Sequence, residues 1–398
     1  MPGNNGRCSE LIMDANLKLI PEEIFATLAD LVSINSVNPQ YPGGPGEGKI
    51  AEYVGEFFQR HSIPFSYQEV FAGRPNVIAT LAGAGGQKLI LEAHMDTASE
   101  IGMTIEPFRP VTKNGLMYGR GSCDTKAGLA AMMHAVKAVH DTGLRPQASV
   151  VLVASVDEEH GFHGIRKFVE VGVQADGAVV AEPTDLETVV ASKGVLRWRV
   201  HSHGTAAHSA KPHLGVNAIA KMCTFITAIE RHLLPTYHLR QHPLLGSPTL
   251  TVGIIHGGIQ VNQVPESCSI DVDRRLLPGE TRETAWEEIE PLIGELRATD
   301  SDLNLTMEPP YLDDPAMETP SSARIVQLAS SVARQVKGAA RLVGVPFGSD
   351  ASKLSRRGIP SIILGPGSID RAHAAEEFVE LDQVAQAAEI YARLILAF

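Results

Sequence analysis

The chain has 398 residues, with 46 acidic and 34 basic side chains, and its formal net charge is −12 with histidine neutral. This length predicts two domains or three. The 44% hydrophobic and 20% charged residues are typical of globular proteins and exclude a disordered, collagen-like or coiled-coil chain. The acidic balance disfavours nucleic acid and anionic membranes as partners, because phosphate binding needs clustered cations.

The N-terminal half alternates helices and strands after about a dozen residues that look like a loose tail. Apolar residues at helical spacing predict helices. These helices cover Pro21–Ile34, Gly48–Arg60, Ala127–Val139 and Gly164–Val171. Nearly continuous apolar runs predict strands that are buried on both faces, as in a sheet covered by helices. The strands cover Asn76–Leu81, Lys88–Glu92, Ser149–Ser155 and Ala178–Ala181.

The pattern changes near Ser192, where strands of alternating polarity begin. KGVLRWRVHSHG, TLTVGIIHGG and SCSIDVDRRL predict half-exposed strands, with helices over Val216–Leu233 and Thr284–Arg297. Their order fits a ferredoxin-like β-α-β-β-α-β unit with one open face. The earlier pattern returns in the last segments, which are Ser321–Val336, Ser361–Leu364 and Leu381–Leu396.

We therefore predict an α/β protein with a discontinuous larger domain and an inserted smaller one. The larger domain, residues 1–191 and 307–398, has three layers around a mixed, mostly parallel sheet. The smaller α+β domain covers residues 192–306. No window of about 18 apolar residues predicts a membrane-spanning helix, and the N-terminus lacks the apolar run of a signal peptide. Four scattered cysteines without a CxxC pair favour a reducing cytoplasm.

Histidines and carboxylates gather after the predicted strands and before one helix, where open α/β sheets place functional groups. Two imidazoles with several carboxylates suit a divalent cation such as zinc. Five side chains, with one carboxylate shared, fill two three-ligand sites. These five are His94, Asp124, Glu159, Glu182 and His373. Two such ions polarise a carbonyl and generate hydroxide from water.

Two more acidic residues lie beside these candidates. Glu158, next to Glu159, remains free to move a proton as general base and acid. Asp96, two residues after His94, is placed to accept the second imidazole N–H and so to fix the tautomer. Cys123 also lies beside Asp124, but a small buried cysteine needs no role in metal binding or nucleophilic attack.

Nine motifs occur in the order of a known family, from about residue 27 to the C-terminus. They are HMDT, YGRGSCDTKAG, DEE before Gly, AEPT, HGTAAHSA, GGIQVNQVP, DRRLLPGE, GSDA and GPGSIDRAHAAEEFV. The chain resembles the di-zinc amidohydrolase and exopeptidase family that contains acetylornithine deacetylase, succinyl-diaminopimelate desuccinylase, aminoacylase and a glutamate carboxypeptidase.

The resemblance implies a role for each site residue. Asp124 would bridge two ions, with His94 and Glu182 on one and Glu159 and His373 on the other. Zinc is expected, with cobalt and manganese as alternatives. Glu158 would be the general base and acid, and Asp96 would orient His94.

The resemblance also implies that the smaller domain is a lid and dimerisation module. His208 in HGTAAHSA would reach the active site of the partner subunit and stabilise the oxyanion. Asn262 and Arg275 would contact the substrate, with Arg275 as a bidentate clamp on a carboxylate. The alternatives to His208 are the neighbouring His201, His203 and His213. The alternatives for Arg275 are that Arg274 takes its role, or that Arg275 only forms a surface salt bridge.

The predicted activity is hydrolysis of the amide bond of an N-acyl amino acid by a cytoplasmic homodimer. The alternative is a carboxypeptidase or dipeptidase with the same two-metal site and a short peptide as substrate. A binding protein without activity would lack a ligand or Glu158, whereas all of them are present. A structural scaffold is disfavoured, because buried carboxylates are costly without a cation. The chain departs from the usual motifs of the family at DTKAG, TASEIGMTIEPF and His160. These departures bear on how the substrate fits and not on the reaction class.

Overall fold

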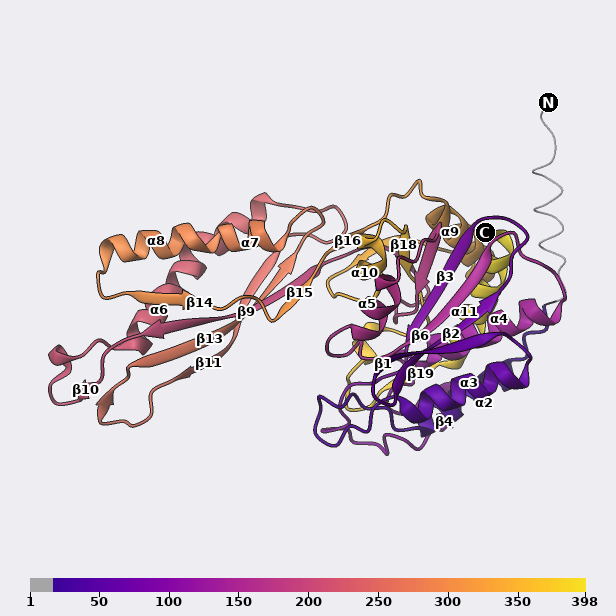
Figure 1. Ribbon diagram of the computed structural model, residues 1–398, viewed down its shortest axis with the longest axis horizontal. Helices are drawn as coiled ribbons and strands as arrows, with labels where there is room; N and C mark the ends of the chain where they lie inside the picture. Colours follow the sequence, from indigo (N-terminus) through magenta and orange to yellow (C-terminus); the bar gives the residue numbers. More distant parts are fainter. Residues whose placement is uncertain (1–16) are drawn as a thin grey trace, which may run out of the picture. The chain divides into compact units, whose positions relative to one another are not determined.

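The computed structural model describes residues 17–398, so the predicted N-terminal tail lies outside the described residues. The chain forms two compact units (Figure 1). The first runs to Val190 and continues with Thr319–Val343 and Ser349–Phe398. The second comprises Ala191–Glu318 and Gly344–Gly348.

A nine-stranded mixed sheet forms the middle layer of the first unit, although the two residues of its last strand, β16, are counted with the second unit. Its strand order is β1-β2-β6-β3-β7-β18-β8-β16, with β17 also paired to β8. The strands are β1 (Phe65–Phe71), β2 (Arg74–Leu81), β3 (Lys88–His94), β6 (Ser149–Ser155), β7 (Gly177–Val180), β8 (Thr188–Ser192), β16 (Met317–Glu318), β17 (Leu342–Val345) and β18 (Ser361–Ile363). The mixed sheet was predicted. Parallel pairing joins the four central strands β6, β3, β7 and β18, and the pairs β1–β2, β2–β6, β18–β8 and β8–β16 on either side of them are antiparallel.

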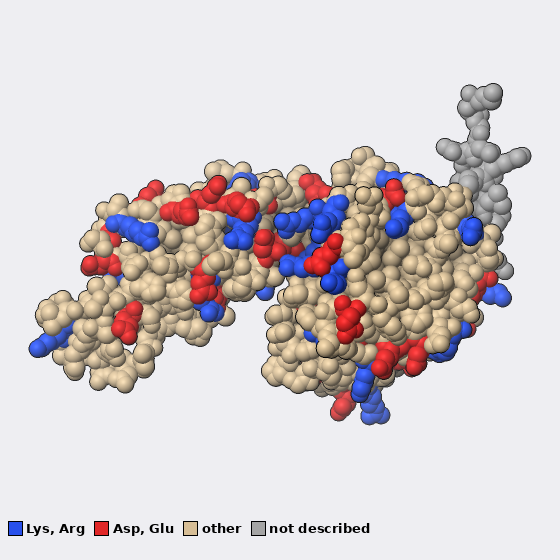
Figure 2. All heavy atoms as spheres, in the orientation of Figure 1, with Lys and Arg blue, Asp and Glu red and all other residues tan. Residues whose placement is uncertain are grey.

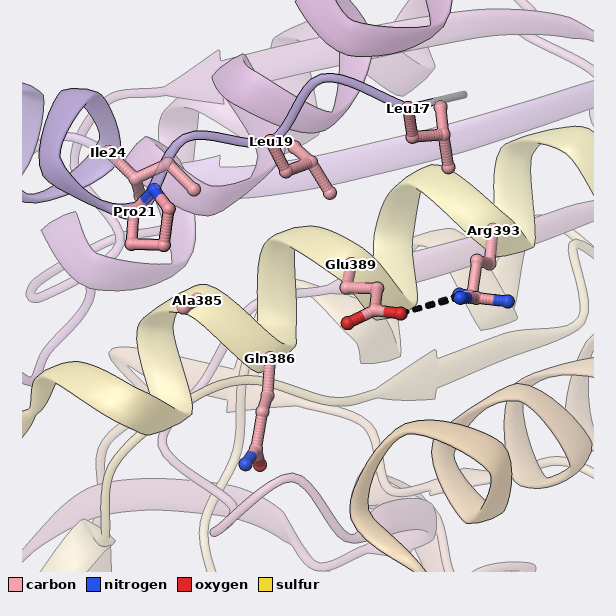
Figure 3. A pocket seen from close by; sticks show the side chains of 8 residues that line it. All are labelled: Leu17, Leu19, Pro21, Ile24, Ala385, Gln386, Glu389 and Arg393. Atoms are coloured by element: carbon pink, nitrogen blue, oxygen red, sulfur yellow. Dashed lines mark hydrogen bonds and ion pairs between the residues drawn. The ribbon is translucent and has the colours of Figure 1, made fainter. Parts of the chain in front are cut away.

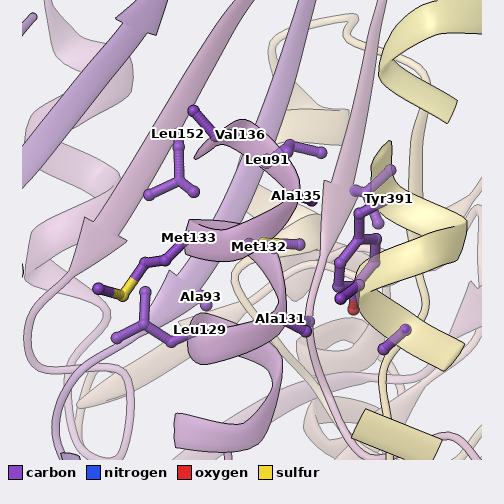
Figure 4. Packing of buried hydrophobic residues seen from close by; sticks show 14 of the residues in the cluster. Leu91, Ala93, Leu129, Ala131, Met132, Met133, Ala135, Val136, Leu152 and Tyr391 are labelled. Carbon is purple, nitrogen blue, oxygen red and sulfur yellow. The ribbon is translucent and has the colours of Figure 1, made fainter. Parts of the chain in front are cut away.

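Helices cover both faces of this sheet, which gives the three predicted layers. One face packs on α2 (Pro21–Ser33), α3 (Gly48–Arg60), α4 (Lys126–Asp141), α9 (Arg324–Lys337) and α11 (Leu381–Ala397). Side chains alternate along a strand, so Leu91 and Ala93 of β3 pack against α4 and α11, as Figure 4 shows. Glu92 and His94 point to the opposite face, which carries α5 (His163–Glu170) and α10 (Ala351–Arg356).

A small three-stranded sheet joins two segments that are distant in sequence. It consists of β4 (Val111–Lys113), β5 (Leu116–Tyr118) and β19 (Phe378–Glu380), in the order β19-β5-β4. Phe378 pairs with Tyr118 and Glu380 with Leu116. The pairing therefore places the chain just after His373 beside the chain just before Asp124.

The second unit has the predicted β-α-β-β-α-β order. Its sheet runs β11-β13-β9-β14 and is antiparallel. These strands are β9 (Gly194–His203), β11 (Thr249–Gly257), β13 (Ser267–Leu276) and β14 (Asn304–Met307). Residues such as Trp198 and Ile270 pack under the helices α6 (Ala218–Ala228), α7 (Arg282–Glu287) and α8 (Ile289–Thr299). Arg199 and Asp271 form an ion pair on the other face of the sheet.

The second unit is longer than the predicted residues 192–306. Strand β15 (Leu312–Asp314) pairs with β9, so the unit continues to Glu318, and it also includes Gly344–Gly348. A short pair of strands, β10 (Ala207–His208) and β12 (Gln263–Val264), lies outside the main sheet. After α6 the chain continues as a π-helical turn, Ile229–Leu233, and a 3-10 helix, Leu234–Leu239.

Three properties bear on the expected environment and partners. Within residues 17–398, every helix is too short or too polar to cross a membrane. The described cysteines, Cys123, Cys223 and Cys268, are free thiols. On the face drawn in Figure 2, basic and acidic side chains are interspersed over both units.

Candidate metal centre

The parallel strands at the centre of the sheet deliver the candidate ligands to one edge. Four neighbouring strands run in the same direction, so their carboxyl ends lie together. His94 is the last residue of β3, Glu159 follows β6, and Glu182 follows β7. His373 comes after β18, in the segment between a 3-10 turn and β19, and Asp124 lies just before α4.

The five candidate ligands form two groups that share one residue. Ligand atoms of His94, Asp124 and Glu182 lie within 4.8 Å of one another, and so do those of Asp124, Glu159 and His373. Asp124 Oδ1 is 3.1 Å from His94 Nε2, while its Oδ2 is 3.5 Å from His373 Nε2. The two oxygens of Asp124 thus face two different histidines, which is the arrangement of a carboxylate that bridges two ions.

The donor set fits a pair of divalent cations. Each group offers one imidazole and two carboxylates, a combination typical of zinc and related ions. Burial and the nearby charge of Asp124 raise the pKa of Glu182 well above its ordinary value. A bound cation would offset both effects and keep the buried carboxylates ionised.

Neighbouring carboxylates raise the pKa of both candidate histidine ligands. The hydrogen bond to Glu159 raises the pKa of His373 to about 9. Burial lowers the pKa of His94, but the hydrogen bond to Asp124 and the nearby carboxylate of Asp96 outweigh burial and leave that pKa well above the ordinary value. A metal ligand must be neutral imidazole, so metal binding would release these protons.

Asp96 acts on the site in two ways. His94 Nδ1 lies 2.9 Å from the main-chain oxygen of Asp96 and 3.6 Å from its Oδ1, so the nearest acceptor is the carbonyl and not the predicted carboxylate. The carboxylate instead accepts the main-chain N–H of Glu158 at 3.0 Å and of Glu159 at 3.1 Å. Asp96 therefore holds both the imidazole and the turn after β6.

Glu158 belongs to neither ligand group in the described residues, although it adjoins Glu159. Burial, followed by the charge of Glu182, raises the pKa of Glu158 well above its ordinary value. A carboxyl group whose pKa is raised from the usual acidic range is suited to accept and return a proton near neutral pH.

Sequence reasoning missed two residues that organise the centre. Glu377 lies within the quoted motif GPGSIDRAHAAEEFV but received no role, and its carboxylate accepts the N–H groups of Cys123 and Asp124. Asn38 lies outside the quoted motifs, and its amide donates hydrogen bonds to Asp96 and Asp157. The only sequence signal was a polar residue near a motif, which does not reveal a bond partner far along the chain.

The predicted lid residues all lie in the second unit. His208 Nδ1 accepts the N–H of Ala210 at 3.1 Å, and Ser209 N–H donates to Asn262 O at 3.0 Å, so His208 and Asn262 are neighbours. Arg275 lies next to the last residue of β13 and forms an ion pair with Asp273 at 2.7 Å.

Arg274, the alternative to Arg275, is bound within the unit. It is fully buried, forms an ion pair with Glu280 at 3.1 Å and lies over the ring of Tyr237. The side chain of Arg275 is 27% exposed and so remains the better candidate for a substrate contact.

A separate surface cavity of about 380 Å³ lies between α11 and the chain that enters α2 (Figure 3). Its wall consists largely of apolar residues such as Leu19 and Ile24, and its charged residues Glu389 and Arg393 are paired with each other. It shares no residue with the five candidate ligands, so it has no part in the chemistry described above.

Comparison with known proteins places the chain in a family. Residues 90–397 match the model of peptidase family M20/M25/M40. The chain belongs to this family and is a metal-dependent hydrolase. It is 30% identical over 390 residues to an acetylornithine deacetylase of Myxococcus xanthus, covering 94% of this chain and 97% of that one. The resemblance found in the sequence motifs is thereby confirmed.

Solved structures share the fold. A tripeptidase of Staphylococcus aureus superimposes with a TM-score of 0.78 at 23% identity, covering 95% of this chain and 98% of that one. A dinuclear metal binding peptidase of family M20 from Bacillus subtilis gives a TM-score of 0.71 at 15% identity, with the same coverage. At these identities the likeness shows the fold alone.

Proposed function

We propose that this protein hydrolyses the amide bond of N-acyl amino acids, with two divalent cations held by His94, Asp124, Glu159, Glu182 and His373. The observation that carries the proposal is the sharing of Asp124 between two three-ligand groups, with Glu158 outside both. The 30% identity to an acetylornithine deacetylase and the name of the dinuclear relative support it. Zinc is the proposed ion, with cobalt and manganese as the alternatives.

Bound cations would supply polarisation of the substrate carbonyl and a lowered pKa of water. Glu158 accepts the proton of the attacking water and returns it to the amine nitrogen as the C–N bond breaks, which yields a carboxylic acid and an amine. Asp96 holds the main chain of Glu158 in place during both transfers. Because Glu158 only moves one proton from the water to the leaving amine, the reaction needs no cofactor besides the metal ions.

We propose further that the active enzyme is a homodimer. His208 lies on the short β10–β12 pair, whereas Arg275 pairs with Val195 at the opposite end of β13 from Ser267. At about 3.4 Å per residue, the length of β13 separates these ends by roughly 25 Å, so one copy of the second unit cannot bring both to one small substrate. His208 of one copy and Arg275 of the other would complete each site, with Asn262 beside His208.

An exposed apolar edge supports contact between two copies. Strand β11 is at the edge of its sheet, and Ile254 and Ile255 on it are 48% and 50% exposed. Ile259 and Val261, which follow it, are more exposed still. An unpaired apolar edge is a template for strand pairing, and a twofold axis would let the same edge serve both copies. We place the enzyme in the cytoplasm, in keeping with its free thiols.

The alternative is a carboxypeptidase or dipeptidase that uses the same residues on a peptide bond, as the fold shared with a tripeptidase would allow. Both substrate classes have a carboxylate that Arg275 would bind and an amide bond that the metal centre would hydrolyse. The proposed site residues therefore do not distinguish the two classes. The identity over nearly the whole chain to a deacetylase favours the N-acyl amino acid.

A substrate panel tests the proposal. Zinc-loaded enzyme would be given N-acetyl and N-succinyl amino acids, dipeptides and tripeptides, and the released amine would be measured. We expect kcat/KM for one N-acyl amino acid to exceed that of every peptide by about tenfold or more. A clear preference for peptides would establish the alternative, and hydrolysis of neither class would refute both. Glu158→Gln serves as the inactive control.

A further inference from the structure

The side chain of Asn38 lies between two buried carboxylates. Its Nδ2 donates to Asp96 Oδ2 at 2.8 Å and to Asp157 Oδ1 at 2.9 Å, and the residue is 0% exposed. Its Oδ1 accepts the main-chain N–H of Gln40 at 3.0 Å. Ionised carboxylates only accept, and a main-chain N–H only donates, so the partners dictate that the amide points its two N–H bonds at the carboxylates.

The main chain holds Asn38 in place independently of its side chain. Asn38 N–H donates to Thr97 O at 3.0 Å, and Thr97 N–H donates to Ser36 O at 3.1 Å. The loop after α2 is thus bound to the loop after β3. The amide of Asn38 is therefore a fixed donor and not a mobile surface group.

Both acceptors of this amide control the turn that carries Glu158. Asp96 binds the main-chain N–H groups of Glu158 and Glu159. Asp157 precedes them in a left-handed conformation, with φ of 66°, and its carboxylate is also 2.5 Å from His163 Nδ1. Asn38 joins these two supports, so the turn is held by its main chain on one side and by the side chain of Asp157 on the other.

We propose that Asn38 is a positioning residue, which fixes Glu158 for proton transfer by joining Asp96 to Asp157. The inference rests on the proposed role of Glu158. Without the amide, the two buried carboxylates lose the donor that they share, and repulsion between their like charges favours their separation. Asp157 keeps its contacts with Arg74 and His163, and Asp96 keeps the main-chain N–H groups of the turn, but nothing then joins the two carboxylates. The turn between them would shift, and a displacement of about 1 Å from reactive geometry can lower a rate by on the order of 10²-fold.

Two substitutions separate donation from packing. Asn38→Ala removes the amide, whereas Asn38→Asp keeps its size but replaces the donor with a third carboxylate. We expect kcat at saturating metal to fall on the order of 10–100-fold in Asn38→Ala, with KM unchanged. Asn38→Asp should lose at least as much. If Asn38 only fills space, Asn38→Asp retains its activity, and that result would overturn the proposal.

The matched control comes from the same loop. Asn35 Oδ1 accepts Val37 N–H at 3.0 Å, and this bond leads to no carboxylate of the centre, so Asn35→Ala should keep the wild-type kcat. Should Asn38→Ala fail to fold, Asn38→Ser retains one donor and should show an intermediate loss. Loss of activity that is fully explained by loss of metal would count against positioning of Glu158.

Hydrogen exchange gives a readout that does not depend on the reaction. In Asn38→Ala, amides of residues 156–162 should exchange faster, while those of β6, residues 149–155, stay as in the wild type. Unchanged exchange overturns the proposal, and so does faster exchange with a wild-type kcat. If the wild type hydrolyses no amide, the proposed function fails, but exchange still decides whether Asn38 holds the turn.

Discussion

The carboxylate of Glu377 accepts the main-chain N–H of Asp124 at 3.0 Å, although 253 positions separate the two residues. It also accepts the N–H of Cys123 and forms an ion pair with Arg120 at 2.7 Å, and it is 0% exposed. Glu377 lies four residues after His373. One buried carboxylate thus fastens the segment of His373 to the residue shared by both ligand groups.

We expect Glu377→Gln to weaken metal binding on the order of 10–100-fold without unfolding the protein. Both oxygens of Glu377 accept hydrogen bonds from donors, so either orientation of the amide would place an NH₂ group against a donor. Competition with a chelator measures the affinity. Glu376→Gln is the matched control, because Glu376 is the exposed neighbour. Equal affinity in the two variants would show that Glu377 does not position Asp124.

Glu158→Gln should lower kcat by on the order of 10²–10⁴-fold while the protein keeps its metal. The amide is the size of the carboxyl group but cannot accept the proton of water. Glu182→Gln provides the contrast, since Glu182 belongs to a ligand group and its loss should remove metal as well as activity. Turnover and metal content measured on the same samples distinguish the two outcomes. Turnover at the wild-type level in Glu158→Gln would remove that residue from its role.

The sequence predicted the long apolar elements well because burial governs them. The helix Gly48–Arg60 has the predicted ends. Strand β3 begins at the predicted Lys88 and ends at His94, shortly after the predicted end at Glu92. Sequence reasoning missed β1, which has no continuous apolar run, and the strands of the small sheet, whose three residues are too few to show a pattern. The predicted helix Thr284–Arg297 divides near Glu288, because Pro291 in the first turn of α8 lacks the N–H that would continue α7.

The convergence of the candidate ligands could be predicted for a related reason. His94, Glu159 and Glu182 each follow a strand that can be recognised, so the direction of the strands brings them together. Asn38 and Glu377 could not be predicted, since their roles depend on hydrogen bonds to residues more than 50 positions away. Neither composition nor spacing records such bonds.

Mixing two inactive variants tests the composite site. Glu158→Gln and His208→Ala would each be inactive alone, yet in a mixed dimer one site has both residues intact. After subunits exchange in an equal mixture, about a quarter of the sites should be intact, so activity should return to about a quarter of the wild-type level. Mixing Glu158→Gln with Glu182→Gln is the control and should restore nothing, since both changes lie in the first unit. No recovery in the first mixture would place both residues in one chain's site or refute the dimer.

The buried His134 should make the fold sensitive to acid. It is 5% exposed, its Nε2 is 2.8 Å from Thr27 Oγ1, and burial lowers the pKa of His134 to about 4. The unfolded chain has a histidine pKa near 6.5, so between these values it binds more protons than the folded protein. The contribution of His134 to stability is therefore complete above about pH 6.5 and is lost as the pH falls to 4, by on the order of 3 kcal/mol. Urea unfolding of the wild type and His134→Gln from pH 7 to pH 4 measures the difference, and we expect the free energy of unfolding to fall less steeply in the variant. Parallel curves for the two proteins would show that protonation of His134 does not drive the loss.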